Sequence, residues 1–426
     1  MQNNRGFTLI EILITMGLVI AVLVITGSAF NAILKTTGGL VSSEGSNIEG
    51  VVGLEMFRHD IQQCGLGLPH EFGNPAPPQY AEAAVAPANT LNDGSGTVAA
   101  PGDGKVPRAI ASWNDLVGAS DAISEPGVTY SVLNGTDYLV IKSASIGTNT
   151  AARKWTYLTL DGVKIWPEVE DRLVDSEDQV IVVNRKYSTD GMVTNILVYT
   201  APENYGPTYK ANLSDWVDVY KLIPPLDTYY VYGITRNNAN PSTPLPLVMP
   251  FNRADYFVAR PSDSQRIPSS CATNTGILYK ATVNHGAASD TKTGKLTYMP
   301  LVDCVADMQV VFGWDFNNDG VIEESSAYEG DVAKIFTSGS TITPSSIKTV
   351  METSADIRSK LKWIKVYIMA QEGRRDSGFT NTAPINVGDT TNTGLTKAYT
   401  VADLVTKGWL NYRWKVYRII INPNSL

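Results

Sequence analysis

Near its N-terminus the chain reads Arg5-Gly6-Phe7-Thr8-Leu9-Ile10-Glu11, and an uncharged run then extends to Leu34. As an α-helix, the 23 residues of this run would rise about 35 Å, enough to cross a bilayer core of about 30 Å. Arg5 precedes the run, so the positive-inside tendency places the N-terminus in the cytoplasm and exports the rest. Glu11 stands out, because a carboxylate inside an apolar helix is costly and by default marks a function.

Two simple interpretations account for only part of this segment. A secretory signal peptide needs a small-residue cleavage site after about 7–15 apolar residues, and this run is longer. A plain membrane anchor explains the hydropathy but not Glu11. The segment closely resembles the processing site of type IV prepilins and pseudopilins, in which a membrane prepilin peptidase cuts a short hydrophilic leader after the glycine.

The resemblance implies a role for three residues. The Gly6–Phe7 bond would be cut, Phe7 would become the N-methylated terminus, and Glu11 would be the family's fifth-position glutamate. In a filament core of apolar helices, a bare ammonium and a bare carboxylate are both costly. Pairing Glu11 with a neighbour's terminal amine would relieve both and set the axial register. Many major pilins carry a proline where this chain has Ser28, so details of helix kinking do not carry over.

Composition excludes several classes of function. The 426-residue chain has a net charge of −8, which disfavours nucleic-acid binding. Three His and three Cys leave few candidates for a zinc or histidine-based centre. No P-loop, Gly-x-Ser-x-Gly or His-Glu-x-x-His motif is present. We therefore expect a protein that is not an enzyme.

The remaining sequence predicts an α+β protein in which a long N-terminal helix precedes a large antiparallel β-rich region. Leu54, Phe57 and Ile61 have the spacing of one buried helical face. Glycines between 38 and 53 suggest that the helix is partly unwound or extensible. Residues 73–108, rich in Pro, Ala and Gly, are interpreted as a long surface loop or insertion and not as a core element. Strand signals dominate from residue 128, with Asn134-Gly135 as the strongest hairpin signal.

The expected divisions are a leader (1–6), a transmembrane and filament-core helix (7–64), a Pro/Gly-rich loop (65–109), an inserted β-rich subdomain (110–250) and a C-terminal pilin-like β domain (251–426).

A second, moderate resemblance lies toward the C-terminus. The chain looks like the PilW-like group of large minor pilins at Arg58-His59-Asp60-Ile61 and over residues 276–281, 300–320, 357–370 and 412–421. Residues 73–250 contribute little to it. The resemblance implies a low-abundance subunit that helps to initiate pilus assembly in a tip complex.

One loop has the pattern of a calcium site. Oxygen ligands fall at loop positions 1, 3, 5 and 9, Gly320 permits a sharp turn, and a backbone carbonyl at position 7 could contribute. These ligands are Asp315, Asn317, Asp319, Glu323 and the carbonyl of Val321. Position 12 is Ala327 instead of the EF-hand glutamate, so a shorter nine-residue calcium loop fits better. The alternative is an Asx-rich turn without metal.

The cysteines, histidines and acidic clusters support few other sites. Export permits disulfides; we favour Cys271–Cys304, although pairing of Cys64 with either remains open. His59, His70 and His285 form no metal-spaced pair, and His59 and His285 are expected to be surface or satisfied polar residues. The acidic clusters at 168–171 and 175–178 are expected in solvated loops. The 20 Tyr and 8 Trp could form a carbohydrate- or surface-binding face, but aromatic pairs in the core are the favoured use.

These observations predict a minor pilin of a type IV pilus. The alternatives are a type II secretion pseudopilin and an adhesin or ligand-binding module mounted on a pilin stem. Expected partners are the prepilin peptidase, other major and minor pilins, the inner-membrane assembly platform and the membrane itself. Before assembly the protein would lie in the bacterial inner membrane as a single-pass protein, and afterwards it would reach the periplasm or cell surface.

Overall fold

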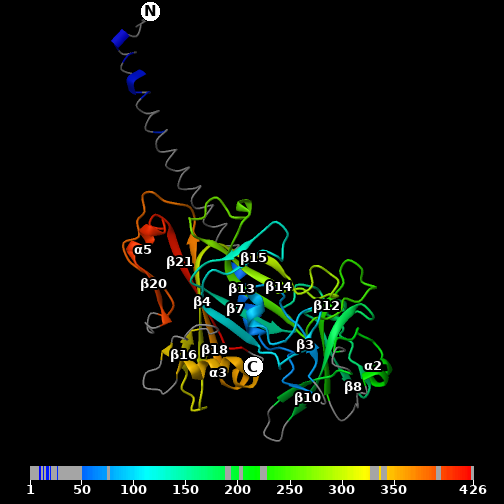
Figure 1. The fold of residues 1–426 in the computed structure, drawn as a ribbon. Coiled ribbons are helices and arrows are strands. Elements are labelled where there is room, and N and C mark those ends of the chain that lie inside the picture. The colour runs from blue at the N-terminus through cyan, green and yellow to red at the C-terminus, as the bar shows by residue number, and fades with distance from the viewer. Residues whose placement is uncertain are drawn as a thin grey trace, which may run out of the picture.

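The computed structural model describes residues 50–73, 77–187, 193–200, 205–220, 228–326, 335–336, 343–389 and 395–423, with isolated positions between 9 and 26. The fold is β-rich with few helices, and its strands form two main sheets (Figure 1). The described positions between 9 and 26 are helical, but most of the expected stem helix lies outside the described residues. Residues 50–62 form a helix with Leu54, Phe57 and Ile61 buried, which confirms the predicted apolar face.

The large sheet has eleven strands, and its pairs are antiparallel. They are β4 (Ile110–Leu116), β5 (Ser120–Asp121), β6 (Tyr130–Val132), β7 (Thr136–Ser143), β13 (Asn252–Pro261), β14 (Gly276–Val283), β15 (Leu296–Trp314), β16 (Glu323–Ser326), β17 (Ile335–Phe336), β18 (Leu361–Glu372) and β21 (Arg413–Ile421). Its central order is β4-β7-β13-β14-β15-β18-β21. β5 and β6 lie beside the end of β13, and β16 and β17 beside the end of β15.

The second sheet has six strands, in the order β1-β11-β10-β12-β8-β9. They are β1 (Glu71–Phe72), β8 (Trp155–Thr159), β9 (Gly162–Val163), β10 (Asp178–Tyr187), β11 (Val193–Leu197) and β12 (Thr228–Arg236). Ile181 and Val183 of β10 enter the core of the large sheet. Val180 and Val182 enter a separate core with Trp216 of α2 (Leu213–Tyr220). This alternation follows from the two-residue period of a strand.

Short elements complete the fold. These are the small ribbons β2 (Gln79–Tyr80) with β3 (Gly102–Asp103) and β19 (Ile385–Val387) with β20 (Lys397–Tyr399), the helices α3 (Pro344–Glu352), α4 (Ser354–Lys360) and α5 (Val401–Thr406), and the 3₁₀ helices η1 (Ala88–Leu91), η2 (Val169–Asp171) and η3 (Ser264–Arg266). Thr400 begins α5 with a capping box, in which its hydroxyl and the carboxylate of Asp403 satisfy each other's backbone N–H groups.

Three expectations about the fold need correction. The segment 73–108 is expected to be a surface loop, but in its described part, residues 77–108, the side chains of Tyr80, Ala83, Val85, Ala88 and Leu91 are buried in the main core. Small alanine side chains occur in closely packed segments as well as in loops, so an alanine-rich composition does not distinguish the two. Across the boundary expected at residue 250, β4–β7 share the large sheet with the C-terminal strands.

The second correction concerns Asn134-Gly135, which does not close a hairpin. β6 and β7 instead pair in succession with the same edge of β13. The amide of Leu133 donates to the carbonyl of Val258 at the break between them. Gly135 has φ 79°, a left-handed conformation that glycine adopts readily. At this residue the chain passes from β6 to β7 along the same edge of β13. The partner strand therefore overrides the local turn preference.

The third correction concerns the glycines of the N-terminal helix. Gly50 and Gly53 lie in regular helix, while Gly38, Gly39 and Gly45 lie outside the described residues. A Cβ atom at residue 53 would fall 2.1 Å from the carbonyl oxygen of Leu301. Gly53 therefore permits close approach of the helix to β15, which is a packing role instead of an unwinding role.

Candidate functional site

The junction between the N-terminal helix and the large sheet is where any stem must hold the β-rich body. Phe57 is fully buried there and stacks on Tyr256 of β13, with ring centroids 4.3 Å apart. Stacked rings of this kind add about 0.5–1.5 kcal/mol to the area that they bury. The helix is therefore held by an aromatic contact at one turn and by the close approach at Gly53 one turn earlier.

A buried charge pair completes this junction. The Nζ of Lys280, on β14, lies 2.5 Å from Oδ2 of Asp60, and both side chains are almost fully buried. The hydroxyl of Tyr256 donates to the same carboxylate oxygen. Burial and the charge of Asp60 raise the pKa of Tyr256 well above its usual value, so the tyrosine remains a donor. Rotation of the helix would leave Lys280 buried without its partner, so the pair fixes the orientation of the helix.

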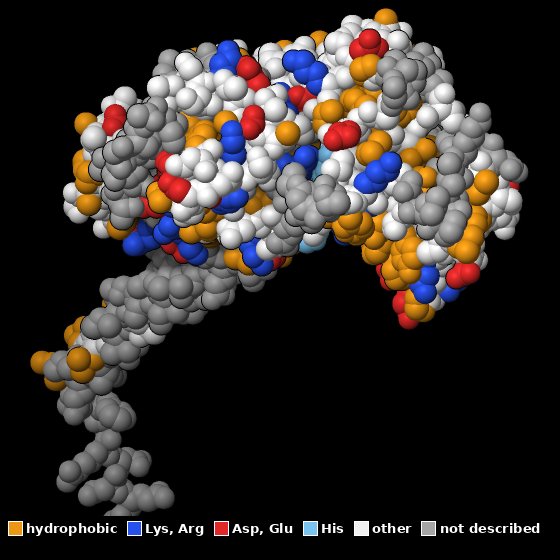
Figure 2. All heavy atoms as spheres, turned by 90° about the horizontal axis from the view of Figure 1, so that it is seen from below, with side chains coloured by type: hydrophobic (Ala, Val, Ile, Leu, Met, Phe, Trp, Pro, Cys, Tyr) orange, Lys and Arg blue, Asp and Glu red, His pale blue; other side chains and the backbone are white. Residues whose placement is uncertain are grey.

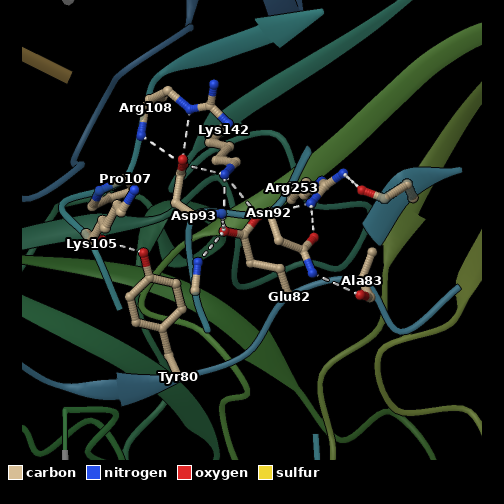
Figure 3. Close-up of polar contacts among 12 residues, drawn as sticks. Tyr80, Glu82, Ala83, Asn92, Asp93, Lys105, Pro107, Arg108, Lys142 and Arg253 are labelled. Atoms are coloured by element: carbon tan, nitrogen blue, oxygen red, sulfur yellow. Dashed lines mark hydrogen bonds and ion pairs between the residues drawn. The ribbon is translucent and has the colours of Figure 1, made fainter. Parts of the chain in front are cut away.

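A second buried network ties residues 79–108 to the large sheet (Figure 3). Lys142 of β7 places Nζ 2.7 Å from Oε2 of Glu82 and 2.5 Å from Oδ2 of Asp93. Arg253 of β13 places Nη1 2.8 Å from Oε2 of Glu82. Arg108 places Nε 2.6 Å from Oδ1 of Asp93.

The electrostatics of this network are balanced. Arg253 also pairs with Asp255, so three cations meet three carboxylates. Burial alone would raise the pKa of Asp93, but the charges of Lys142 and Arg108 hold it below its usual value. Each charge faces an opposite one, which suits a structural clamp better than proton-transfer chemistry.

Sequence reasoning missed this network, although a signal was present. Lys142 follows the apolar run of β7, and Arg253 and Asp255 lie within the predicted core strand β13. Charged residues in such strands are rarely buried unless they are paired. Their positions therefore indicated buried partners, but not which residues those partners are.

The three residues of the predicted processing site, Gly6, Phe7 and Glu11, lie outside the described residues. Nearby described side chains are apolar, and Leu9, Ile10, Leu13, Met16 and Leu18 are between 60% and 79% exposed. Within the part of the chain that the structure describes, no helix combines the length and apolarity needed to span a bilayer.

The candidate calcium loop connects β15 to β16. The amide of Gly320 donates to Oδ2 of Asp315, and the amide of Val321 donates to Oδ1 of Asp319. The amide group of Asn317 donates to Oδ2 of Asp319. Oδ1 of Asp315 and Oε2 of Glu323 are buried and have no hydrogen-bond partner within the described part of the chain. Among the described residues, no three His, Cys, Asp or Glu side chains are gathered closely enough to form a metal site.

The favoured disulfide is confirmed. Cys271 and Cys304 are bonded, with their Cα atoms 4.9 Å apart. Cys64 is free and buried at the end of the N-terminal helix, where its thiol donates to the carbonyl of Ala109. Burial raises the pKa of this thiol, so Cys64 has little of the reactive thiolate form.

The histidines match the expectation of ordinary or satisfied residues. His59 is exposed. His285 is buried, accepts from the amide of Val248 at Nδ1, and contacts Oδ1 of Asn252 through Nε2. Burial lowers the pKa of His285 to about 4, so its ring is neutral at pH 7. Burial likewise lowers the pKa of His70 to about 4.

The acidic clusters follow the expectation with one exception. Glu168, Glu170 and Asp171 are exposed, as is Asp175. Asp178 is instead fully buried, with its Oδ1 2.5 Å from Nε of Arg236. The prediction of a solvated loop is wrong for Asp178, because this residue is the first of strand β10 and does not belong to the preceding loop.

Aromatic side chains mostly occupy the core, as expected. Tyr138 and Phe257 stack between neighbouring strands, with centroids 4.6 Å apart. On the second sheet, however, Trp155 is 39% exposed and packs against Trp166 and Tyr230. Figure 2 shows hydrophobic side chains exposed on this right-hand part of the molecule. A cavity of about 390 Å³ opens beside them, lined by Tyr157, Leu158, Thr159, Leu160, Asp161, Thr228 and Tyr230.

Comparison with known proteins identifies the N-terminal segment. Residues 1–27 match the family model described as the prokaryotic N-terminal methylation motif. The chain is thus type IV prepilin- or pseudopilin-like in this segment. Neither the comparison with curated proteins nor that with solved structures finds a match.

Proposed function

We propose that this chain is a minor pilin of a type IV pilus. The prepilin peptidase would cut the Gly6–Phe7 bond, and Phe7 would then be N-methylated. The mature subunit would pass from the inner membrane into a filament, contributing to assembly initiation in a tip complex with other pilins. The observation that carries the proposal is the match of residues 1–27 to the methylation motif.

The exposed apolar side chains near the N-terminus support this proposal. Leu9, Ile10 and Leu13 are helical and at least 62% exposed. In water such a surface is unfavourable, whereas a bilayer or a bundle of like helices would bury it. The firm junction at Phe57, Asp60 and Lys280 would then transmit the position of the stem to the body.

The presence of the second sheet supports a subunit that occurs in few copies per filament. Packed helices lie about 8–10 Å apart, so a filament built from such stems brings successive bodies close together. A body that carries a further six-stranded sheet is more easily accommodated at an end than at every repeat. The similarity to PilW-like minor pilins favours a pilus over a type II secretion pseudopilin, which would share the same N-terminus.

Mass spectrometry of the mature N-terminus tests the processing step. Cells with the peptidase should contain a chain that starts at N-methyl-Phe7, and cells without it should retain Met1. An intact Met1 in cells with the peptidase would contradict the proposal.

Substitution of Glu11 tests the assembly step. Glu11→Val should be processed normally but be strongly depleted from sheared filaments, because the neighbouring terminal amine loses its partner. Ser28→Ala, within the same apolar run, is the matched control and should assemble normally. Equal incorporation of both variants would remove the proposed role of Glu11.

Filament counts and labelling test the minor role. Deletion of the gene should sharply reduce the number of pili per cell, and an antibody to the body should label filament ends. Uniform labelling along filaments would indicate a major subunit, while a secretion defect with normal pili would indicate a pseudopilin.

A further inference from the structure

The loop between β15 and β16 contains negative charge that nothing on the described chain neutralises. Trp314 and Glu323 are paired across this hairpin, so the backbone at Asp315 lies close to that at Glu323 where the loop begins and ends. None of the ion pairs among the described residues includes Asp315, Asp319 or Glu323. The loop therefore holds three carboxylates without a cationic partner among the residues that the structure describes.

Two oxygen atoms in this loop are buried and unsatisfied. Asp315 is only 6% exposed, and its Oδ1 has no hydrogen-bond partner. Oε2 of Glu323, on the other side of the hairpin, is also buried and has no hydrogen-bond partner among the described residues. A buried carboxylate oxygen without a partner loses its hydration and gains nothing in return. Most buried polar groups are satisfied, so these two call for an unseen partner.

The shape of the loop leaves that partner a route from solvent. Asn317, Asp319 and Gly320 are exposed, whereas Asp315, at the start of the loop, is buried. Asn318 and Gly320 have φ angles of 58° and 82°, so the chain reverses sharply around the carboxylates. A cation could enter past the exposed side chains and reach the buried oxygens of Asp315.

We propose that residues 315–323 bind one calcium ion. Its ligands would be the side chains of Asp315, Asn317, Asp319 and Glu323 with the carbonyl of Val321. Hard oxygen ligands without nitrogen or sulfur exclude a zinc preference. Mixed carboxylate, amide and carbonyl ligands on a flexible loop suit Ca²⁺ better than the rigid octahedron of Mg²⁺.

Binding requires a local rearrangement. Asn317 and Asp319 now bond to each other and to the loop backbone. The amide of Asn317 would turn its oxygen inward, and Asp319 and Glu323 would move toward Asp315. The ion would thereby join the ends of β15 and β16 and order their connection. The inference does not depend on the pilin function.

Terbium luminescence on the full chain in detergent tests the site directly. Trp314 is fully buried and adjoins Asp315, so it should sensitise emission from Tb³⁺ bound in the loop. After removal of metals with a chelator, Tb³⁺ should give sensitised emission that Ca²⁺ displaces at concentrations where Mg²⁺ does not. Absence of emission, together with no rise in the thermal midpoint on adding Ca²⁺, would overturn the proposal.

Matched variants assign the signal to this loop. Asp319→Ala should weaken binding of Tb³⁺ and Ca²⁺ at least tenfold and abolish the Ca²⁺-dependent thermal shift. Asp290→Ala is the control, because Asp290 is also exposed and accepts from the amide two residues on, as Asp319 does. Asp319→Asn, which keeps that hydrogen bond but lacks the charge, guards against misfolding and should also weaken binding. Equal responses from the variants at 319 and 290 would contradict the assignment.

Discussion

The large sheet is held to its neighbouring segments by buried charges as well as apolar contacts, whereas the second sheet is attached chiefly by apolar side chains. Lys142 and Arg253 join the large sheet to residues 79–108. Ile181 and Val183 join the second sheet to the main core. Charge pairs have few acceptable geometries, while apolar contacts tolerate small displacements. The difference indicates that the large sheet and residues 79–108 are held in one fixed arrangement, whereas the attachment of the second sheet tolerates small displacements.

Breaking the buried network should have the largest effect. Arg253→Met leaves Glu82 and Asp255 buried without that cation and should cost about 3–5 kcal/mol of unfolding free energy. Denaturant unfolding measures this change. Glu352→Gln removes an ion pair with Lys348 in which both side chains are about half exposed, and should cost less than about 1 kcal/mol. Similar losses in the two variants would refute the contrast.

The hydrogen bonds between the two sheets should be sensitive to acid. Asn252 donates to the carbonyl of Ile234 on β12, and its Oδ1 contacts Nε2 of the neutral ring of His285. With its folded pKa near 4, His285 binds a proton more readily when unfolded. The neutral ring of His285 contributes about 3 kcal/mol to the free energy of unfolding. This contribution is complete above about pH 6.5 and is lost as the pH falls toward 4.

Unfolding curves between pH 7 and 4 check this dependence. The variant His285→Gln offers an acceptor and a donor without a titrating group, so its stability should fall less steeply. His70 titrates in both proteins, so the difference between their curves isolates His285. Parallel curves would show that His285 does not titrate as expected.

The close approach of the N-terminal helix to β15 should give an intermediate effect. Gly53→Ala brings a methyl group against the Leu301 carbonyl and should cost about 1–3 kcal/mol. Gly50→Ala is matched, because its Cβ would meet only the Cγ1 of Val302 at 3.8 Å. It should be neutral or stabilising by up to about 1 kcal/mol. Thermal unfolding of both variants decides whether the helix is tightly docked.

The exposed rim of the second sheet should give the smallest effect. Trp155→Ser removes a partly exposed ring and its contacts with Trp166 and Tyr230, at a cost of about 1 kcal/mol or less. Calorimetry can resolve a change of this size. A loss comparable to that of Arg253→Met would mean that this rim is as firmly fixed as the large sheet.

Most strands were predictable because their signal is local. β14, β15 and β18, for example, lie in the region from residue 128 onward in which the sequence shows strand signals. Strand periodicity depends only on neighbouring residues. α3 and α4 were missed, because short helices that cover a sheet carry little periodicity of their own.

Pairing was not predictable to the same extent. β6 and β7 look like a hairpin, but both find a better partner in β13. Asp60 and Lys280 are 220 residues apart and still share one buried contact. The resemblance motifs that contain them, Arg58-His59-Asp60-Ile61 and residues 276–281, meet only in the folded chain.

By itself, the sequence determined the prepilin-like N-terminus, the apolar face at Leu54, Phe57 and Ile61, the β-rich body and the carboxylate spacing of the 315–323 loop. These features depend on covalent order, helical and strand periods, and local turn chemistry. Only the tertiary structure decided the burial of residues 79–108, the choice of Cys271 and Cys304 as partners, and the isolation of the buried oxygens in the loop. Burial and charge pairing depend on residues distant in sequence, and the free energy of a charge is set by the partners that folding brings to it.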